Sequence, residues 1–297
     1  MENVLTLIAG RDGALSDDMV FAIRQALKDL GAHVAVPTWL SPGKACDVPF
    51  GHLAPEQADA AARHRLGKAP VDVVAQPLDG RRKLLLVADM DSTMVVGETL
   101  DELAEYAGIK DRIAVITARA MNGEVGFEAA LRERIGLRAG LPEAALERTW
   151  AKTELMPGAR TLVQTMKANG AYCVLVSGGF TYFTTRVRQA CGFDRDLGNR
   201  FIFTDGKLAG VEDPILGRET KLATLISTAG ERKIPLALSA AVGDGANDLD
   251  MIKAAGLGVA FQAKPVVAAE ARVRIDHGGL IALLYAQGYG DDAMVEG

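Results

Sequence analysis

The sequence is poor in cysteine and aromatic residues and contains no run of basic residues. It has three cysteines in 297 residues, none of them in a C-x-x-C spacing, which excludes a disulfide framework and a cysteine-based zinc site. Its lysines and arginines are dispersed and its net charge is −5, so we expect no nucleic acid among its partners. The longest uncharged stretch, residues 168–185, contains asparagine, glycine, serine and threonine, so we expect no membrane span.

The beginning of the chain does not resemble a secretory leader. Glu2 stands where positive charge is usual, and the apolar stretch from Val4 to Ala9 is too short for a signal core. Together with the low cysteine content, this favours the reducing cytoplasm as the location. At 297 residues and 49% hydrophobic composition, the chain is long enough for a large domain with a small one, or for a core with an inserted lobe.

The first third of the sequence predicts a small α+β domain. Strand, helix and strand patterns follow one another, with Ser16 as a plausible helix N-cap, at residues 4–9, 16–30 and 33–40. A mixed region with an Ala-rich helical piece at 56–66 comes next. We place the junction near residues 68–79, which gives an N-terminal domain of residues 1–75 and a second domain of residues 76–297.

The remainder alternates between strand and helix patterns. A helix is predicted from Pro157-Gly158 to Lys167, and Asp205-Gly206 marks a hairpin. Strands are predicted at residues 84–88, 172–176, 201–204, 207–211, 236–242 and 258–261. Residues 98–153 have helical periods and almost no strand signal, so we expect a helical insertion at about 96–155. The fold class is therefore α/β, a doubly wound parallel sheet with a helical insertion.

Two acids follow the first strand of this second domain. Leu84 to Ala88 is a continuous apolar run that ends on Asp89-Met90-Asp91. Ligands of parallel α/β sheets bind outside the carboxyl ends of the strands, and a hard divalent cation would relieve the repulsion between two close carboxylates. The alternative is an ordinary acidic turn.

Two other strands end in small or acidic residues. Ser177-Gly178-Gly179 and the segment Gly243 to Asp248 could meet Asp89 at one sheet edge, and Lys221 begins a helix nearby in sequence. Hydroxyl, amide and ammonium donors suit phosphoryl oxygens. Taken singly, the Ser-Gly-Gly segment is typical of a turn and Lys221 of a solvated surface lysine. Asp248 replaces the third glycine of a dinucleotide fingerprint, and a Walker loop is missing, so we expect neither a nicotinamide cofactor nor a P-loop.

In this order DMDST, SGG, a lone lysine and GDGAND resemble the four motifs of the haloacid dehalogenase-like phosphatases, from about Leu84 to the C-terminus. The insertion resembles the cap of the phosphoserine phosphatases in Glu98, residues 121–123, Phe127 and residues 131–134. The N-terminal segment resembles the ACT-like segment of longer bacterial members. The resemblance implies a Rossmann-like core with an inserted cap.

The resemblance also implies residue roles. Asp89 would be the nucleophile, and Asp91 the general acid and then the base. Mg²⁺ would be held by Asp89, the Asp91 carbonyl and Asp244, and Asp248 would orient Lys221 or a metal-bound water. The phosphoryl oxygens would be held by Ser177, Gly178, Gly179, Lys221 and Asn247. Glu98 and Arg134 would bind the ammonium and carboxylate of O-phospho-L-serine, beneath an apolar lid of Met121 and Phe127.

Three functions remain open at this point. The resemblance favours Mg²⁺-dependent hydrolysis of O-phospho-L-serine, the last step of serine biosynthesis. A second possibility is another small phosphomonoesterase, or a phosphotransferase that passes the phosphoryl group to an alcohol. A third is a regulatory amino-acid-binding protein whose phosphatase core is vestigial, although the intact acids Asp89, Asp91 and Asp244 speak against it. The N-terminal segment could bind an amino acid or form a homodimer surface.

Overall fold

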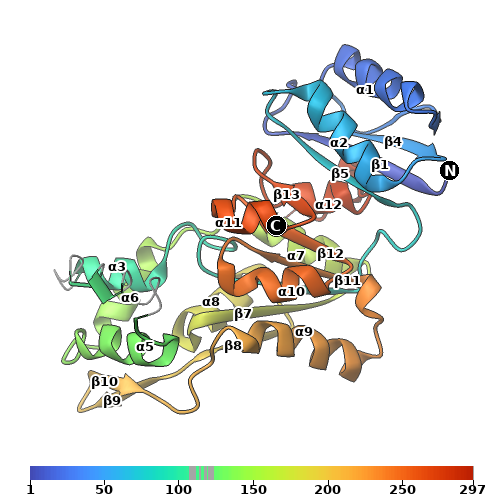
Figure 1. Cartoon of the computed structure of the whole chain (residues 1–297). Coiled ribbons are helices and arrows are strands. Elements are labelled where there is room, and N and C mark those ends of the chain that lie inside the picture. The colour runs from blue at the N-terminus through green and yellow to red at the C-terminus, as the bar shows by residue number, and fades with distance from the viewer. Residues whose placement is uncertain (107–111, 114, 117–118, 120–123, 297) are drawn as a thin grey trace.

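The computed structural model describes residues 1–106, 112–113, 115–116, 119 and 124–296. Three parts are visible in Figure 1: an N-terminal domain in blue, a central α/β core, and a helical cap in green at the end of the core away from the N-terminal domain. No helix among these residues is long and apolar enough to cross a membrane.

The N-terminal domain is an antiparallel sheet covered by two helices. Its strands are β1 (Asn3–Ala9), β2 (His33–Val34), β3 (Thr38–Ser41), β4 (Ala45–Gly51) and β5 (Val71–Pro77). The sheet order is β2-β4-β1-β5, with β3 paired to β4. Its helices are α1 (Asp17–Asp29) and α2 (Pro55–Leu66), and the Ser16 hydroxyl accepts the Met19 N–H as the predicted N-cap of α1.

Some predicted boundaries of this domain differ from the structure. The single strand predicted at 33–40 is two short strands, because the chain leaves the sheet around Pro37. Strand β4 was not predicted, and β5 occupies residues that the sequence pattern assigns to the domain junction. The buried polar residues Asp47 on β4 and Asp72 on β5 interrupt the apolar pattern by which strands are recognised.

The core sheet has six parallel strands and the doubly wound topology that the sequence predicts. Its order is β13-β12-β11-β6-β7-β8. The strands are β6 (Leu85–Ala88), β7 (Tyr172–Phe180), β8 (Arg195–Asn199), β11 (Ser239–Gly243), β12 (Leu257–Phe261) and β13 (Val273–Ile275). The chain runs outward from β6 to β8 and then returns to β11 on the other side of β6. Strands β6 and β11 therefore flank the topological switch point, where α/β sheets bind ligands.

Helices cover both faces of this sheet, and the apolar side chains between the layers form its core (Figure 1). The helices are α7 (Ala159–Ala168), α8 (Thr181–Cys191), α9 (Glu219–Arg232), α10 (Leu249–Ala254), α11 (Pro265–Glu270) and α12 (Ala282–Ala286). The predicted hairpin is β9 (Phe201–Thr204) with β10 (Lys207–Val211). One prediction was wrong at its start: residues 236–238 form a 3₁₀ turn, and the strand predicted at 236–242 begins at Ser239.

The cap is inserted between β6 and β7, as predicted. Its described helices are α3 (Thr99–Tyr106), α5 (Phe127–Gly136) and α6 (Ala144–Lys152). The two segments that join the cap to the core pair with each other, because the Val96 N–H donates to the Glu154 carbonyl and the Met156 N–H to the Met94 carbonyl. This pairing holds the cap beside the carboxyl ends of the core strands.

Candidate active site

Buried carboxylates gather at the switch point of the core sheet. Asp89 follows β6, and Asp244 and Asp248 follow β11, the neighbouring strand. The backbone hydrogen bond from the Asp89 N–H to the Val242 carbonyl, at 3.0 Å, fixes the two strand ends side by side. Carboxylate oxygens of the three residues lie within 4.8 Å of one another, and each side chain is buried. The sequence thus brings distant acids to a single point.

Lys221 compensates part of this negative charge from helix α9. Its Nζ lies 2.7 Å from Asp89 Oδ1 and 2.6 Å from Asp248 Oδ1. Asp248 uses its other oxygen to accept the Gly245 N–H at 3.0 Å. Only 2% of Lys221 is exposed, so the solvated surface lysine considered from sequence is wrong. Burial lowers the pKa of Lys221, but Asp89 and Asp248 outweigh it and raise the pKa, which keeps the ammonium charged.

Asp91 is held apart from the acid cluster by a separate set of bonds. Its Oδ1 accepts the Thr99 N–H at 2.8 Å, and its Oδ2 accepts the Ser177 hydroxyl at 3.3 Å. Ser177 Oγ in turn accepts the Gly179 N–H at 2.8 Å. The side chain of Asn199, the last residue of β8, donates to the Gly178 carbonyl at 2.8 Å. Ser177-Gly178-Gly179, predicted from sequence as a loop, instead forms the last part of β7 before Phe180, and these bonds fix the segment from two sides.

Crowding of acids raises several pKa values at this site. Burial, followed by the charge of Asp89, raises the pKa of Asp91 to about 6, against the opposing bonds from Thr99. Burial and Asp89 raise the pKa of Asp248 to about 7 and also raise that of Asp244. A carboxyl group with a pKa near 6 can give and take a proton close to neutral pH, which suits Asp91 to acid–base work.

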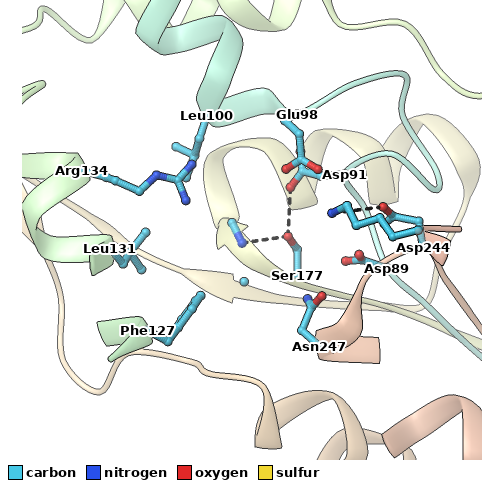
Figure 2. A pocket seen from close by; sticks show the side chains of 13 residues that line it. Asp89, Asp91, Glu98, Leu100, Phe127, Leu131, Arg134, Ser177, Asp244 and Asn247 are labelled. Atoms are coloured by element: carbon cyan, nitrogen blue, oxygen red, sulfur yellow. Dashed lines mark hydrogen bonds and ion pairs between the residues drawn. The ribbon is translucent and has the colours of Figure 1, made fainter. Parts of the chain in front are cut away.

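Asp89, Asp91, Asp244 and the segment 177–179 line a pocket of about 150 Å³ between the core and the cap. Figure 2 shows Asp89, Asp244 and Asn247 on the core side, and Phe127, Leu131 and Arg134 of α5 facing them. Glu98 enters from the residue before α3 and accepts the Ser92 hydroxyl at 3.1 Å. Burial, Asp91 and Asp244 raise the pKa of Glu98 to about 7.

Three of the cap residues that the resemblance names, Glu98, Phe127 and Arg134, line the pocket. Arg134 forms an ion pair with Asp101, at 3.4 Å. Phe127 is 48% exposed, and a Cβ at Gly178 would lie 3.4 Å from its ring. The Phe127 ring therefore lies over Gly178 and not in the core. Met121 lies outside the described residues.

Four contributors were missed from the sequence. Leu100, Leu131 and Lys264 line the pocket, and the Asn199 side chain donates a hydrogen bond to the Gly178 carbonyl. Lys264 follows β12, and its Nζ lies 3.7 Å from Asp244 Oδ2. Applying the strand-end rule to the strand predicted at 258–261 would have found Lys264. The two leucines carry no chemical signal.

The acid cluster fits a hard divalent cation. Its donors are carboxylate oxygens, which such cations prefer. Among the described residues around it, four aspartates face two ammonium groups, and the negative charge that remains is what a divalent cation would offset. Asp248 is itself a member of this cluster, although the resemblance gives it only a supporting role. Both of its carboxylate oxygens already accept hydrogen bonds.

Comparison with known proteins agrees with this architecture. A family model described as haloacid dehalogenase-like hydrolase matches residues 86–253. A phosphoserine phosphatase of Streptomyces coelicolor is 42% identical over 219 residues, 73% of this chain and 53% of that protein. One from Archaeoglobus fulgidus is 42% identical over 235 residues, 76% of this chain and 68% of that protein. The chain thus spans about half the length of the Streptomyces relative.

The fold likeness extends over the N-terminal domain. The crystal structure of a probable phosphoserine phosphatase from Vibrio cholerae, in unliganded form, superposes with a TM-score of 0.79 at 29% identity. The superposition covers 98% of this chain and 88% of that one.

Proposed function

The chain belongs to the haloacid dehalogenase-like hydrolases, and from this premise we propose that it hydrolyses O-phospho-L-serine to L-serine and phosphate. The observation that carries the proposal is that one small pocket holds both a phosphoryl-transfer constellation and an acid with a base for an amino acid. Asp89 and Ser177 in the pocket wall, with Lys221 buried behind Asp89, form the first, and Glu98 and Arg134 form the second.

Asp89 is the nucleophile in this proposal. Its carboxylate oxygen forms a bond to phosphorus while the bond from phosphorus to the serine oxygen breaks, which gives an aspartyl phosphate. Lys221, 2.7 Å from Asp89 Oδ1, orients the attacking carboxylate and offsets the charge of the phosphoryl oxygens. Ser177, the backbone amides that follow it, and Asn247 provide further donors at the carboxyl ends of β7 and β11.

Asp91 supplies and then removes the proton. In the first step it protonates the serine oxygen as that oxygen leaves, and in the second it takes a proton from the water that attacks the aspartyl phosphate. The second step releases phosphate and restores the Asp89 carboxylate. The raised pKa of Asp91, about 6, and its fixed orientation toward Ser177 support this role.

We propose Mg²⁺ as the cofactor, held by Asp89, Asp244 and the carbonyl of Asp91. When bound, Mg²⁺ would neutralise the charge that the phosphate adds to the acid cluster. The buried oxygen donors support this choice, and Asp248 would keep Lys221 in place.

Substrate selection rests on Glu98 and Arg134. The planar guanidinium of Arg134 can grip a carboxylate at two points, and Glu98 can pair with the ammonium. The pocket volume of about 150 Å³ lies below the roughly 300–1,000 Å³ of sites for drug-sized ligands, so a compact metabolite fits better than a phosphorylated protein. Phe127, with Met121 as predicted from sequence, would close the apolar side.

For the N-terminal domain we propose an ACT-like role, either amino-acid binding or association into a homodimer. Its antiparallel sheet with two helices, and the match of the Vibrio structure over nearly the whole chain, support a shared architecture. The three cysteines are free and buried, which suits the cytoplasm that we propose as its location.

A substrate panel tests the function. We expect phosphate release from O-phospho-L-serine in the presence of Mg²⁺, little release without it, and slow release from sugar phosphates. Arg134→Ala should reduce the preference for phosphoserine and leave the other substrates almost unaffected. Equal turnover of sugar phosphates, with a profile unchanged in the variant, would favour a broader phosphomonoesterase, and transfer to an added alcohol would indicate a phosphotransferase.

A further inference from the structure

The cap contains a buried arginine that the proposed mechanism does not use. Arg138 lies two residues beyond the end of α5 and is 1% exposed, which makes it one of the largest fully buried side chains of the protein. Arginine is rarely buried to this extent unless its guanidinium is hydrogen-bonded. The partners of this guanidinium therefore indicate what the residue does.

Two of its nitrogens reach different helices of the cap. Nη1 donates to the carbonyl of Arg134 on α5 at 2.6 Å, and Nη2 donates to the carbonyl of Leu100 on α3 at 2.6 Å. Leu100 lies two residues after Glu98, and both Leu100 and Arg134 line the pocket (Figure 2). Arg138 therefore joins the backbones that carry Glu98 and Arg134.

The distance between Glu98 and Arg134 depends on how α3 packs against α5. Apolar contacts between helices are non-directional, and α3 and α5 share such contacts in the main core cluster, through Leu100, Leu103, Leu131 and Ile135, and in a small cap cluster, through Ala104 and Ala130. Among the cap residues that the structure describes, a further polar link, from Arg134 to Asp101, lies at the surface, where ion pairs contribute little. A planar guanidinium with two fixed donors sets both distance and direction.

Arg138 carries a positive charge although it is buried. Burial and the neighbouring Arg134 lower the pKa of Arg138 to about 10, so it stays charged at neutral pH. Burying a charged group costs several kcal/mol, and an aliphatic side chain would fill the same space without that cost. What arginine adds at this position is the bridge between the two carbonyls.

We propose that Arg138 is a positioning residue for substrate discrimination, which fixes the spacing of Glu98 and Arg134 by bridging the carbonyls of Leu100 and Arg134. This inference rests on the proposed function. It assigns to Arg138 no contact with the substrate.

The test compares Arg138→Met, which fills the space without donors, with Arg138→Lys, which keeps the charge but reaches one carbonyl at a time. The substrates are phosphoserine and methyl phosphate, which has the phosphate ester but neither ammonium nor carboxylate. We expect Arg138→Met to raise the KM for phosphoserine about tenfold with kcat nearly unchanged, as loss of a buried hydrogen bond implies. Methyl phosphate should be hydrolysed as by the wild type, and Arg138→Lys should restore part of the KM.

A binding measurement removes dependence on turnover. In the Asp89→Asn background, calorimetry should show phosphoserine affinity about tenfold weaker when Arg138→Met is added. In an Arg134→Ala background, Arg138→Met should add much less than it does in the wild type, because it acts largely through Arg134. Leu146→Ala is the matched control, because Leu146 is buried in the cap on α6, which contributes no residue to the pocket.

The outcomes separate the two proposals. A wild-type enzyme that does not prefer phosphoserine over methyl phosphate refutes the proposed function. If the wild type shows the preference but Arg138→Met lowers both activities equally, or matches Leu146→Ala in its effect on KM, the positioning role is refuted and Arg138 is only a structural residue.

Discussion

Replacing Lys221 by methionine tests the charge balance of the site. The variant keeps the volume of the side chain but removes the ammonium that lies 2.7 Å from Asp89 and 2.6 Å from Asp248. Removing one partner of a buried ion pair costs about 3–5 kcal/mol, because the other charge remains buried without compensation. We therefore expect the free energy of unfolding to fall by about 3 kcal/mol, and the melting temperature by on the order of 10 °C.

A second variant identifies the cause of that loss. Lys221→Met combined with Asp248→Asn removes both charges, and asparagine keeps an acceptor for the Gly245 N–H. We expect this double variant to recover about 2 kcal/mol of the loss, since neutralising both partners of a buried pair is often nearly neutral. Activity should stay roughly a thousandfold below that of the wild type in both, because the donor to the phosphoryl oxygens is absent.

The assay is urea unfolding of the metal-free protein, followed by fluorescence, with phosphate release measured in parallel. The instability of Lys221→Met should diminish as pH falls, because the raised pKa of Asp248 lets it take up a proton, which relieves its repulsion from Asp89. If the single and double variants are equally unstable, the buried charge of Asp248 is not the source of the loss, and the electrostatic reasoning is refuted.

Three further predictions concern the same strand ends. A Cβ at Gly243 would lie 2.3–2.7 Å from the Asp248 side chain, so Gly243→Ala should lower the free energy of unfolding by about 1–3 kcal/mol and lower kcat. The control Gly230→Ala, with open space on α9, should leave the free energy of unfolding unchanged or raise it slightly. Equal effects of the two substitutions would contradict this prediction. The folded-state pKa values of Asp91 and Asp248, about 6 and 7, exceed the ordinary value of 3.8, so the metal-free protein should lose stability as pH rises from about 4 to 7. Mg²⁺ at 100 times its Kd should raise the free energy of unfolding by about 2.7 kcal/mol. Differential scanning fluorimetry should show that Mg²⁺ raises the melting temperature more at pH 8 than at pH 5.5. A Mg²⁺-induced rise that grows as pH falls would contradict the assignment of these acids as the metal site.

The sequence predicted the core strands β6, β7, β11 and β12 because they are short and apolar and are followed by distinctive residues, whereas the polar β8 and the three-residue β13 were not predicted. β6 is completely buried between helical layers, so Leu85–Ala88 reads as a continuous run, and Asp89 marks its end. The loop predicted at Ser177-Gly178-Gly179 was wrong, because β7 continues through these residues to Phe180, with an irregular pairing to β8 between Val176 and Phe180. The order of the strands in the sheet brought these ends together, as parallel α/β topology requires.

Features that depend on tertiary contacts were not predictable. Asp72 is 1% exposed because it accepts backbone N–H groups from residues 276–278 of the core, contacts that no local pattern encodes. Because Asp72 is polar, the sequence pattern did not predict strand β5. Arg138 resembles a surface arginine in sequence, and only the packing of α3 against α5 reveals its two carbonyl partners. The hydrogen bond from the Asn199 side chain to the Gly178 carbonyl depends on the pairing of β8 with β7.

The central claim is that Asp89 attacks phosphorus and carries the phosphoryl group. Mass spectrometry of the enzyme, quenched in acid during turnover of phosphoserine with Mg²⁺, measures this directly. We predict a phosphoryl group on the peptide that contains Asp89, and none in Asp89→Asn, which should still bind phosphoserine by calorimetry. Steady turnover by Asp89→Asn, or a phosphoryl group on another residue, would contradict the account.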